Sequence, residues 1–163
     1  MSTAWEREFL QRMRTFEARR PPRPGEVSVS IKVRVTSGCF HRAHSPSAYA
    51  LIDESLAGIP PTDFLEFEEH ESGPELLVYV AAGVTLATSV INLIAAIIKA
   101  RSDGVKKGDR PTDPIELIVR RVDDGSEYRE EVLLRFSAQD AVSNKAIGRA
   151  LTQALRRITK GKK

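Results

Sequence analysis

The loop sequence GCFHRAH holds the side chains of this chain that are best suited to chemistry. It places Cys39, His41 and His44 close together, and a thiol beside imidazoles can bind zinc or form a nucleophile with its base. However, C-x-H-x-x-H is not an established zinc spacing, and Cys39 is the single cysteine. We therefore expect a surface loop with incidental histidines, no metal or other cofactor and no catalytic residue. A Cys39-dependent activity is the enzymatic alternative.

Other motifs of catalysis are missing from the sequence. It contains no glycine-rich phosphate loop, no G-x-S-x-G elbow and no H-E-x-x-H metal motif. The carboxylates of Glu66, Glu68, Glu69 and Glu71 form a run that is more typical of a solvated surface than of an acid/base pair. These observations favour a protein that is not an enzyme.

Charge is distributed unevenly along the chain, whose net charge is +3. Lys and Arg are absent between Ala43 and Ile98, where the acidic residues gather, and basic residues crowd both ends. Solvated helix faces and attraction between the basic ends and the acidic middle explain this pattern. A further interpretation is a basic surface for an acidic partner or for non-specific nucleic-acid contact. Its predicted residues are Arg149, Arg156, Arg157 and Lys160.

The elements that must position these residues follow from apolar spacing and turn signals. Helical spacing of Trp5, Phe9, Met13 and Phe16 predicts an amphipathic helix over 3–19, followed by a Pro- and Arg-rich arm. We expect residues 1–25 to form this helix and arm, and residues 26–163 to form a single domain.

Alternating residues predict a strand over 27–35, and a shorter strand is expected over 64–68. Between them, Ser45 and Gly58 are expected to cap a helix at its two ends. Residues 115–136 predict a hairpin around a type I′ Asp-Gly turn. In that hairpin Tyr128, Val132, Leu134 and Phe136 are expected to face the same way as Ile115, Leu117 and Val119. Ser137 is expected to cap a final amphipathic helix with a stripe of Val142, Ile147, Leu151, Leu155 and Ile158.

The segment from Leu76 to Ile98 contains no charged residue and allows two interpretations. Its length and apolarity meet the requirements of a membrane-spanning helix, so a single-pass membrane protein is the alternative. Our preferred interpretation is a buried helix over 73–103, opened by a capping box from Ser72 to Glu75. On such a helix the small and polar residues share one arc.

The large aliphatic side chains occupy the remainder of this predicted helix. They are expected to form a core or oligomer face, and an apolar face this wide predicts a homo-oligomer. Its residues are Leu76, Val80, Leu86, Val90, Ile94, Ile97 and Ile98.

The predicted architecture is α+β. A small mixed β-sheet packs against one long hydrophobic helix, with amphipathic helices at the N- and C-termini. The N-terminus matches neither a secretory signal nor a transit peptide, so we expect a cytoplasmic protein, with the inner membrane as the alternative.

The order of these elements resembles the effector-associated constant component of bacterial conflict systems. The resemblance covers residues 27–158 and rests on the long Ala-, Leu- and Val-rich helix after Gly-Pro-Glu, the ending KARSDG and the hairpin IELIVRRVDDGSEYREEVLLRF. The N-terminal helix, the Pro-Arg arm and the KKGDRPTD link depart from that pattern. The resemblance implies a non-enzymatic adaptor or accessory component that works beside an effector protein in bacterial defence.

Overall fold

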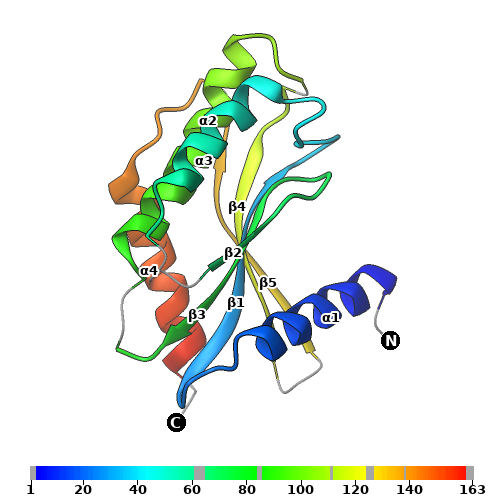
Figure 1. Ribbon diagram of the computed structural model, residues 1–163. Coiled ribbons are helices and arrows are strands. Elements are labelled where there is room, and N and C mark those ends of the chain that lie inside the picture. Colours follow the sequence, from blue (N-terminus) through cyan, green and yellow to red (C-terminus); the bar gives the residue numbers. More distant parts are fainter. Residues whose placement is uncertain are drawn as a thin grey trace.

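The protein is an α+β protein built on an antiparallel five-stranded sheet (Figure 1). A computed structural model describes residues 3–60, 65–83, 86–110, 112–123, 127–137 and 139–160. In these ranges the helices are α1 (Ala4–Arg19), α2 (Pro46–Ala57), α3 (Thr88–Lys106) and α4 (Asn144–Lys160). The strands are β1 (Glu26–Val35), β2 (Leu65–Glu68), β3 (Glu75–Ala81), β4 (Ile115–Asp123) and β5 (Glu127–Phe136).

The strand order is β2-β3-β1-β4-β5, and every neighbouring pair runs antiparallel. The prediction of a mixed sheet is therefore wrong. It failed because one strand, β3, was hidden in the segment predicted as helix. With β3 in place, the β2-β3 and β4-β5 pairs flank β1 on its two sides, and no parallel pairing is needed.

The predicted continuous helix over 73–103 is also wrong, because this segment forms β3 and then α3. Leu76, Val78 and Val80 are buried on one face of β3, and Leu77 is buried on the other. A strand covered on both faces gives an unbroken apolar run, which periodicity cannot distinguish from a buried helix. Gly83, with φ +78°, lies between the two elements in a conformation that favours glycine.

Within the described residues, no helix combines the length and the apolarity needed to cross a bilayer. The burial of α3 follows the arcs expected from its sequence. Val90, Ile94, Ile97 and Ile98 are buried, whereas Thr88, Asn92 and Lys99 are exposed.

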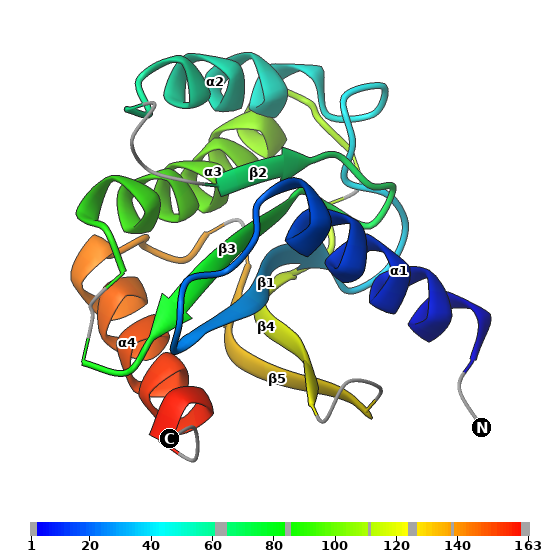
Figure 2. The same ribbon diagram turned by 60° about the horizontal axis from the view of Figure 1, so that its bottom comes forward.

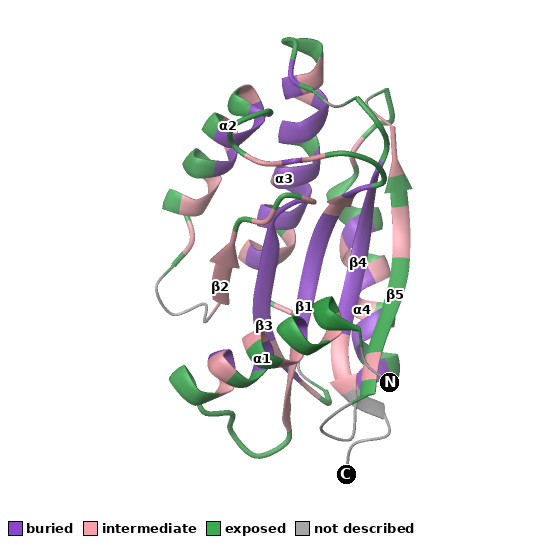
Figure 3. Cartoon of the chain, turned by 90° about the vertical axis from the view of Figure 1, so that its right-hand side faces the viewer, coloured by how far each residue is buried: buried purple, intermediate pink, exposed green. Residues whose placement is uncertain are grey.

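The two faces of the sheet are covered by different helices. The buried side chains of α2, α3 and α4 share one apolar core with Val29, Ile31 and Val33 of β1. On the opposite face, Phe9, Met13 and Phe16 of α1 form a second cluster with Leu77 (Figures 1 and 2). As a result the central strands are buried on both sides, and the edge strands β2 and β5 are more exposed (Figure 3).

The ends of the helices confirm the predicted positions of two caps and exclude a third cap. Glu75 is the first residue of β3, so the capping box from Ser72 to Glu75 does not exist. Ser45 and Gly58 lie at the N-cap and C-cap of α2 as predicted, but Ser45 makes no side-chain capping bond and Gly58 has an ordinary φ of −88°. Instead, the carboxylate of Asp109 accepts the amides of Ser47 and Ala48 at 3.2 and 2.9 Å. A carboxylate from the end of α3 thus caps α2.

The last helix begins later than expected. The hydroxyl of Ser143, not that of Ser137, accepts the first-turn amide of Ala146 at 3.2 Å. The predicted stripe is otherwise confirmed. Ile147, Leu151, Leu155 and Ile158 are buried, and Val142 packs against the same core.

The predicted hairpin is confirmed, but its register differs from the one that a two-residue turn requires. Asp123 pairs with Glu127, so three residues separate the pair, and residues 124–126 lie outside the described part of the chain. The pairing register of the hairpin also shifts between Leu117, which pairs with Leu134, and Ile118, which pairs with Val132. Leu134 therefore packs with the α3 core, whereas Tyr128 packs with the α1 cluster, so the single predicted face is wrong.

Candidate functional site

In the described residues, three groups of side chains could bind a ligand or a metal ion or take part in catalysis. The first is the loop between β1 and α2, where the structure brings Cys39, His41 and His44 together. One ligand atom from each of the three lies within 4.8 Å of the others. Cys39 and His41 are half-buried, and His44 is exposed. The sequence spacing predicted incidental histidines, and it did not reveal that the loop folds back on itself.

The backbone of this loop is held from several sides. Phe40 is fully buried, donates its amide to the Glu71 carbonyl at 2.6 Å, and accepts the Tyr49 hydroxyl at 3.1 Å. The amides of His44 and Ser45 both donate to the His41 carbonyl, at 3.1 and 2.9 Å. The loop that carries the three side chains is therefore pre-organised by bonds that do not use those side chains.

Arg42 anchors the same loop to its surroundings. Its guanidinium donates to Asp53 at 2.7 and 2.9 Å and to Glu69 at 2.6 Å, and it lies over the Tyr49 ring. The hydrogen bond from Arg42 lowers the pKa of Asp53. The side chain of His41 accepts the Ala43 amide at Nδ1, at 3.1 Å. A metal ion on either ring nitrogen of His41 would remove that bond, at a cost of about 1 kcal/mol.

The second group is an ionic network buried between the sheet and α1. Its centre is Glu75, which is fully buried and accepts the Ser30 hydroxyl at 2.6 Å, Arg12 at 3.2 Å and Arg120. Further ion pairs join α1 to the edge of the sheet, because Arg19 and Arg20 both contact Glu66. The expected attraction of the basic N-terminal end to the acidic middle is thus confirmed within one chain.

Lys32 of β1 lies directly opposite Glu75 of the neighbouring strand β3, on the same face of the sheet, and is 4% exposed. Burial, then the positive charges of Arg120, Arg12 and Arg34, lower the pKa of Lys32 to about 7. Burial also lowers the pKa of Arg120. The charged form of Lys32 is therefore disfavoured in the folded state, which is a stability cost to the fold.

Glu68, His70 and Glu75 also bring their ligand atoms within 4.8 Å of one another. Arg12 and Arg120 already bind Glu75, and they would repel a divalent cation at this position. Burial, then the charges of Lys32 and Arg12, lower the pKa of His70. This cluster is best explained as part of the structural contact between α1 and the sheet.

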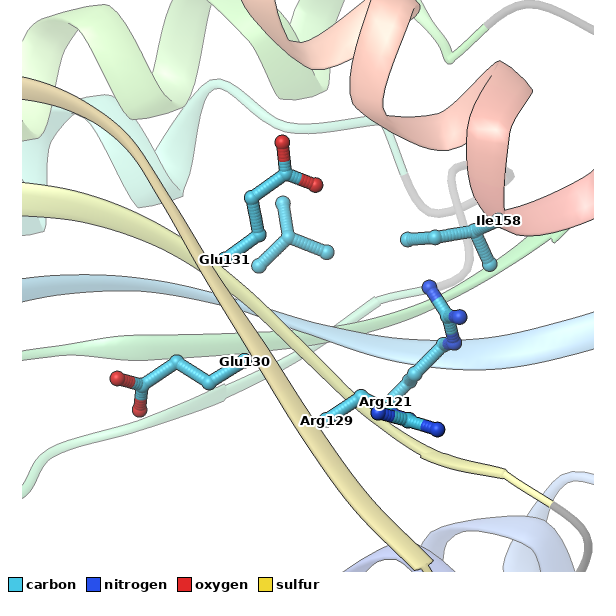
Figure 4. Close-up of a pocket in the computed structure, with 6 residues that line it drawn as sticks. Arg121, Arg129, Glu130, Glu131 and Ile158 are labelled. Carbon is cyan, nitrogen blue, oxygen red and sulfur yellow. The ribbon is translucent and has the colours of Figure 1, made fainter.

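The third group lines a cavity of about 260 Å³ between the β4-β5 hairpin and α4 (Figure 4). We call it the arginine pocket; its lining residues are Val119, Arg121, Arg129, Glu130, Glu131 and Ile158. Arg121 and Arg129 are direct cross-strand partners, as are Val119 and Glu131. Two like charges opposite each other in a sheet are destabilising on their own. A carboxylate beside such a pair offsets this repulsion.

Some positive charges around the arginine pocket are neutralised by ion pairs. Arg129 contacts Glu127 at 2.9 Å, and Arg157 of α4 contacts Glu131. In Figure 4 the side chain of Glu131 runs upward from β5, whereas that of Glu130 runs to the left, away from the labelled arginines. Glu130 accepts Arg34 at 3.2 Å and the Tyr128 hydroxyl at 2.7 Å on the α1 face. On the α4 side, Glu127 and Glu131 thus pair with Arg129 and Arg157.

The predicted basic surface on α4 is partly contiguous with this pocket. Arg149, Arg156 and Arg157 are exposed, whereas the side chain of Lys160 lies outside the described residues. Arg157 contacts Glu131 of the pocket rather than the acidic middle of the chain.

The predicted aliphatic interaction face lies mostly inside the molecule. Leu76, Val80, Val90, Ile94, Ile97 and Ile98 are all buried, and Leu86 is half-buried against the same core. The structure thus places these residues in the core of a single chain. Self-association stays a prediction, and it needs a different surface, because these side chains are already covered.

Sequence reasoning missed the Glu75 network and the arginine pocket. Glu75 was assigned to a helix cap, so its place opposite Lys32 in the sheet could not be foreseen. A two-residue turn would have placed Arg121 opposite Tyr128 rather than opposite Arg129. Adjacent arginines in β4, at positions 120 and 121, were the available signal that both faces of this hairpin carry charge.

No protein-family model, curated protein or solved structure matches the chain. The resemblance to the effector-associated constant component therefore stays a prediction.

Proposed function

We propose that this protein is a non-enzymatic adaptor that binds an acidic, extended segment of a partner protein. The segment lies along the outer edge of β5, and one of its carboxylate side chains enters the arginine pocket. The observation that carries the proposal is the cross-strand pair of Arg121 and Arg129 inside that pocket. The partner corresponds to the effector protein expected from the resemblance, and the setting in bacterial defence rests on that resemblance alone.

The edge of β5 supports an extended ligand. β5 is a ten-residue strand that pairs with β4 on one side and is last in the strand order of the described sheet. An edge strand offers main-chain N–H and C=O groups with which a further strand can pair. Val132 is 45% exposed, an unusually apolar residue among the charged side chains of this edge. An extended peptide can use the main chain for affinity and alternate side chains for specificity.

The dimensions and charge of the arginine pocket support an acidic side chain as the occupant. Its volume of about 260 Å³ falls below the roughly 300–1,000 Å³ of pockets that enclose a small-molecule ligand. Guanidinium groups bind carboxylates with charge-assisted and often bidentate hydrogen bonds. Ile158 and Val119 supply an apolar floor, against which the methylene groups of a glutamate can pack.

A synthetic peptide of alternating glutamate and valine tests this proposal. Added to isotope-labelled protein, it should shift the backbone amide resonances of β5 and the C-terminal half of α4. The same peptide with glutamine in place of glutamate should bind at least about tenfold more weakly, because the guanidinium contacts lose their charge. Rising salt should also weaken binding of the glutamate peptide, since these groups are partly exposed.

The test variant carries both Arg121→Glu and Arg129→Glu. Its control is Lys106→Glu, which makes the same type of charge change at an exposed position on α3. The double variant should lose the peptide, whereas Lys106→Glu should retain it. Equal binding of the glutamate and glutamine peptides would count against an acidic ligand. Dimerisation through β5 without peptide binding would instead identify a second copy of the chain as the occupant and overturn the proposal.

A further inference from the structure

We infer that Cys39, His41 and His44 form a binding site for a transition-metal ion, with Zn²⁺ as the best-suited ion. This site is separate from the arginine pocket and from the adaptor role proposed above. The inference rests on the convergence of the three ligand atoms, which lie within 4.8 Å of one another on a single short loop.

The type of ligands selects the class of metal. One thiolate and two imidazoles suit Zn²⁺, Co²⁺ and Cu²⁺, whereas Mg²⁺ and Ca²⁺ require oxygen ligands. Around a tetrahedral ion with bonds of about 2.0–2.3 Å, ligand atoms lie roughly 3.3–3.8 Å apart. All three ligand atoms already lie within 4.8 Å of one another, and rotation of the side chains can adjust them to these distances.

The surrounding bonds fix the loop in the shape that brings the ligands together. The buried Phe40 side chain and its two backbone bonds hold the chain between Cys39 and His41. Two amides bound to the His41 carbonyl hold the turn between His41 and His44. Binding of an ion therefore orders side chains only and does not have to order the backbone.

Charge around the loop is compatible with a cation. Arg42 lies between the ligands in sequence, but its guanidinium is neutralised by Asp53 and Glu69. In contrast, the Glu68, His70 and Glu75 cluster is bound by two guanidinium groups. Three protein ligands on a partly exposed loop leave one tetrahedral position open, which water fills in sites of this type.

Titration of chelator-treated full-length protein with Co²⁺ tests the site. We expect about one Co²⁺ per chain, with a thiolate-to-metal charge-transfer band and intense d–d bands typical of tetrahedral coordination. Zn²⁺ should displace Co²⁺ and abolish both bands. It should also protect Cys39 from a thiol-modifying reagent.

Three variants make the test decisive. Cys39→Ser should abolish the charge-transfer band and weaken Zn²⁺ binding at least about 100-fold, and His44→Ala should weaken it at least about tenfold. His44 is exposed, so its replacement leaves the fold intact, and circular dichroism checks this. His70→Ala removes the remaining histidine, which belongs to the other cluster, and should leave binding unchanged. Co²⁺ bound without the charge-transfer band, full affinity in Cys39→Ser, or loss of binding in His70→Ala would each overturn the inference.

Discussion

Two glycines in helix interiors show how single positions are constrained in this fold. A Cβ atom on Gly104 of α3 would lie 2.2 Å from Asp109 Oδ2 and 3.0 Å from the Ala48 side chain. Asp109 is the residue that caps α2, so Gly104 allows α2 and α3 to approach at the point where the cap is made. A Cβ atom on Gly148 of α4 would meet only the Ile91 side chain, with Cγ2 at 3.3 Å and Cδ1 at 3.7 Å.

The same substitution should therefore have opposite effects at these two positions. Gly104→Ala should lower the free energy of unfolding by about 2 kcal/mol, because overpacking outweighs the gain in helix propensity of about 1 kcal/mol. Gly148→Ala should raise it by about 0.5 kcal/mol, because the half-buried Ile91 side chain can move aside. Urea unfolding of both variants measures these changes. A stabilised Gly104→Ala protein would show that α2 and α3 can separate without cost.

At the scale of elements, α1 is attached to the sheet by two kinds of contact. Phe9, Met13 and Phe16 bury apolar surface, and Tyr128 lies edge-on to the Phe9 ring with centroids 5.3 Å apart. Beside them, Arg12 of α1 reaches the buried carboxylate of Glu75 at 3.2 Å. The apolar contacts supply the driving force for docking, and the Arg12–Glu75 contact adds a directional bond between α1 and the sheet.

Replacement of Glu75 should be much more costly than replacement of Glu66, whose arginine partners are exposed. Glu75→Gln should lower the free energy of unfolding by about 3 kcal/mol, because it leaves the buried Arg120 charge without its carboxylate. Glu66→Gln, which removes the exposed contacts of Arg19 and Arg20, should change it by no more than about 0.5 kcal/mol. Chemical denaturation of the two variants compares them directly. Equal effects would mean that the burial of Glu75 contributes little.

At the scale of the whole molecule, the sheet is covered on both faces, but the two covers differ in chemistry. The α2, α3 and α4 side is an apolar core, whereas the α1 side also encloses Lys32, Arg120 and Glu75. The charges that shift the pKa of Lys32 come from Arg120 of β4, Arg12 of α1 and Arg34 of β1, and from the opposite charge of Glu130 of β5. The stability of the whole protein is therefore linked to the protonation of Lys32.

The sign of this linkage follows from the lowered pKa of Lys32. The folded state releases the proton near pH 7, whereas the unfolded chain keeps it to about pH 10.5. Between these values the unfolded state binds more protons, so the contribution of Lys32 to stability rises with pH. Lys32→Met should stabilise the protein more at about pH 6 than at about pH 10, by on the order of 3 kcal/mol.

Urea unfolding of the wild type and Lys32→Met at both pH values measures that difference. Lys106→Met, at an exposed position of α3, is the matched control and should show no such dependence. A stability gain in Lys32→Met that is equal at both pH values would show that Lys32 ionises in the folded state as it does in the unfolded chain.

Local sequence signals determined much of the fold. The alternation in β1, the helical spacing in α1 and α4 and the apolar stripe of α3 from Val90 onward each predicted the face that the structure buries. The elements around the functional candidates were thus largely predictable, and so was the placement of Cys39, His41 and His44 in a loop. Each of these features depends on residues close to one another in the chain, whose side chains share a face by simple geometry.

Only the tertiary structure decided the remainder. β3 could not be distinguished from helix, because its burial on both faces depends on α1 and α3, which lie elsewhere in the sequence. Arg121 and Arg129 lie opposite each other only in the observed strand register, which one residue more or less in the turn would change. The Glu75 network joins residues from α1, β1, β3 and β4, and the cap on α2 comes from the end of α3. Such contacts between distant residues arise only when the chain packs, so no local pattern records them.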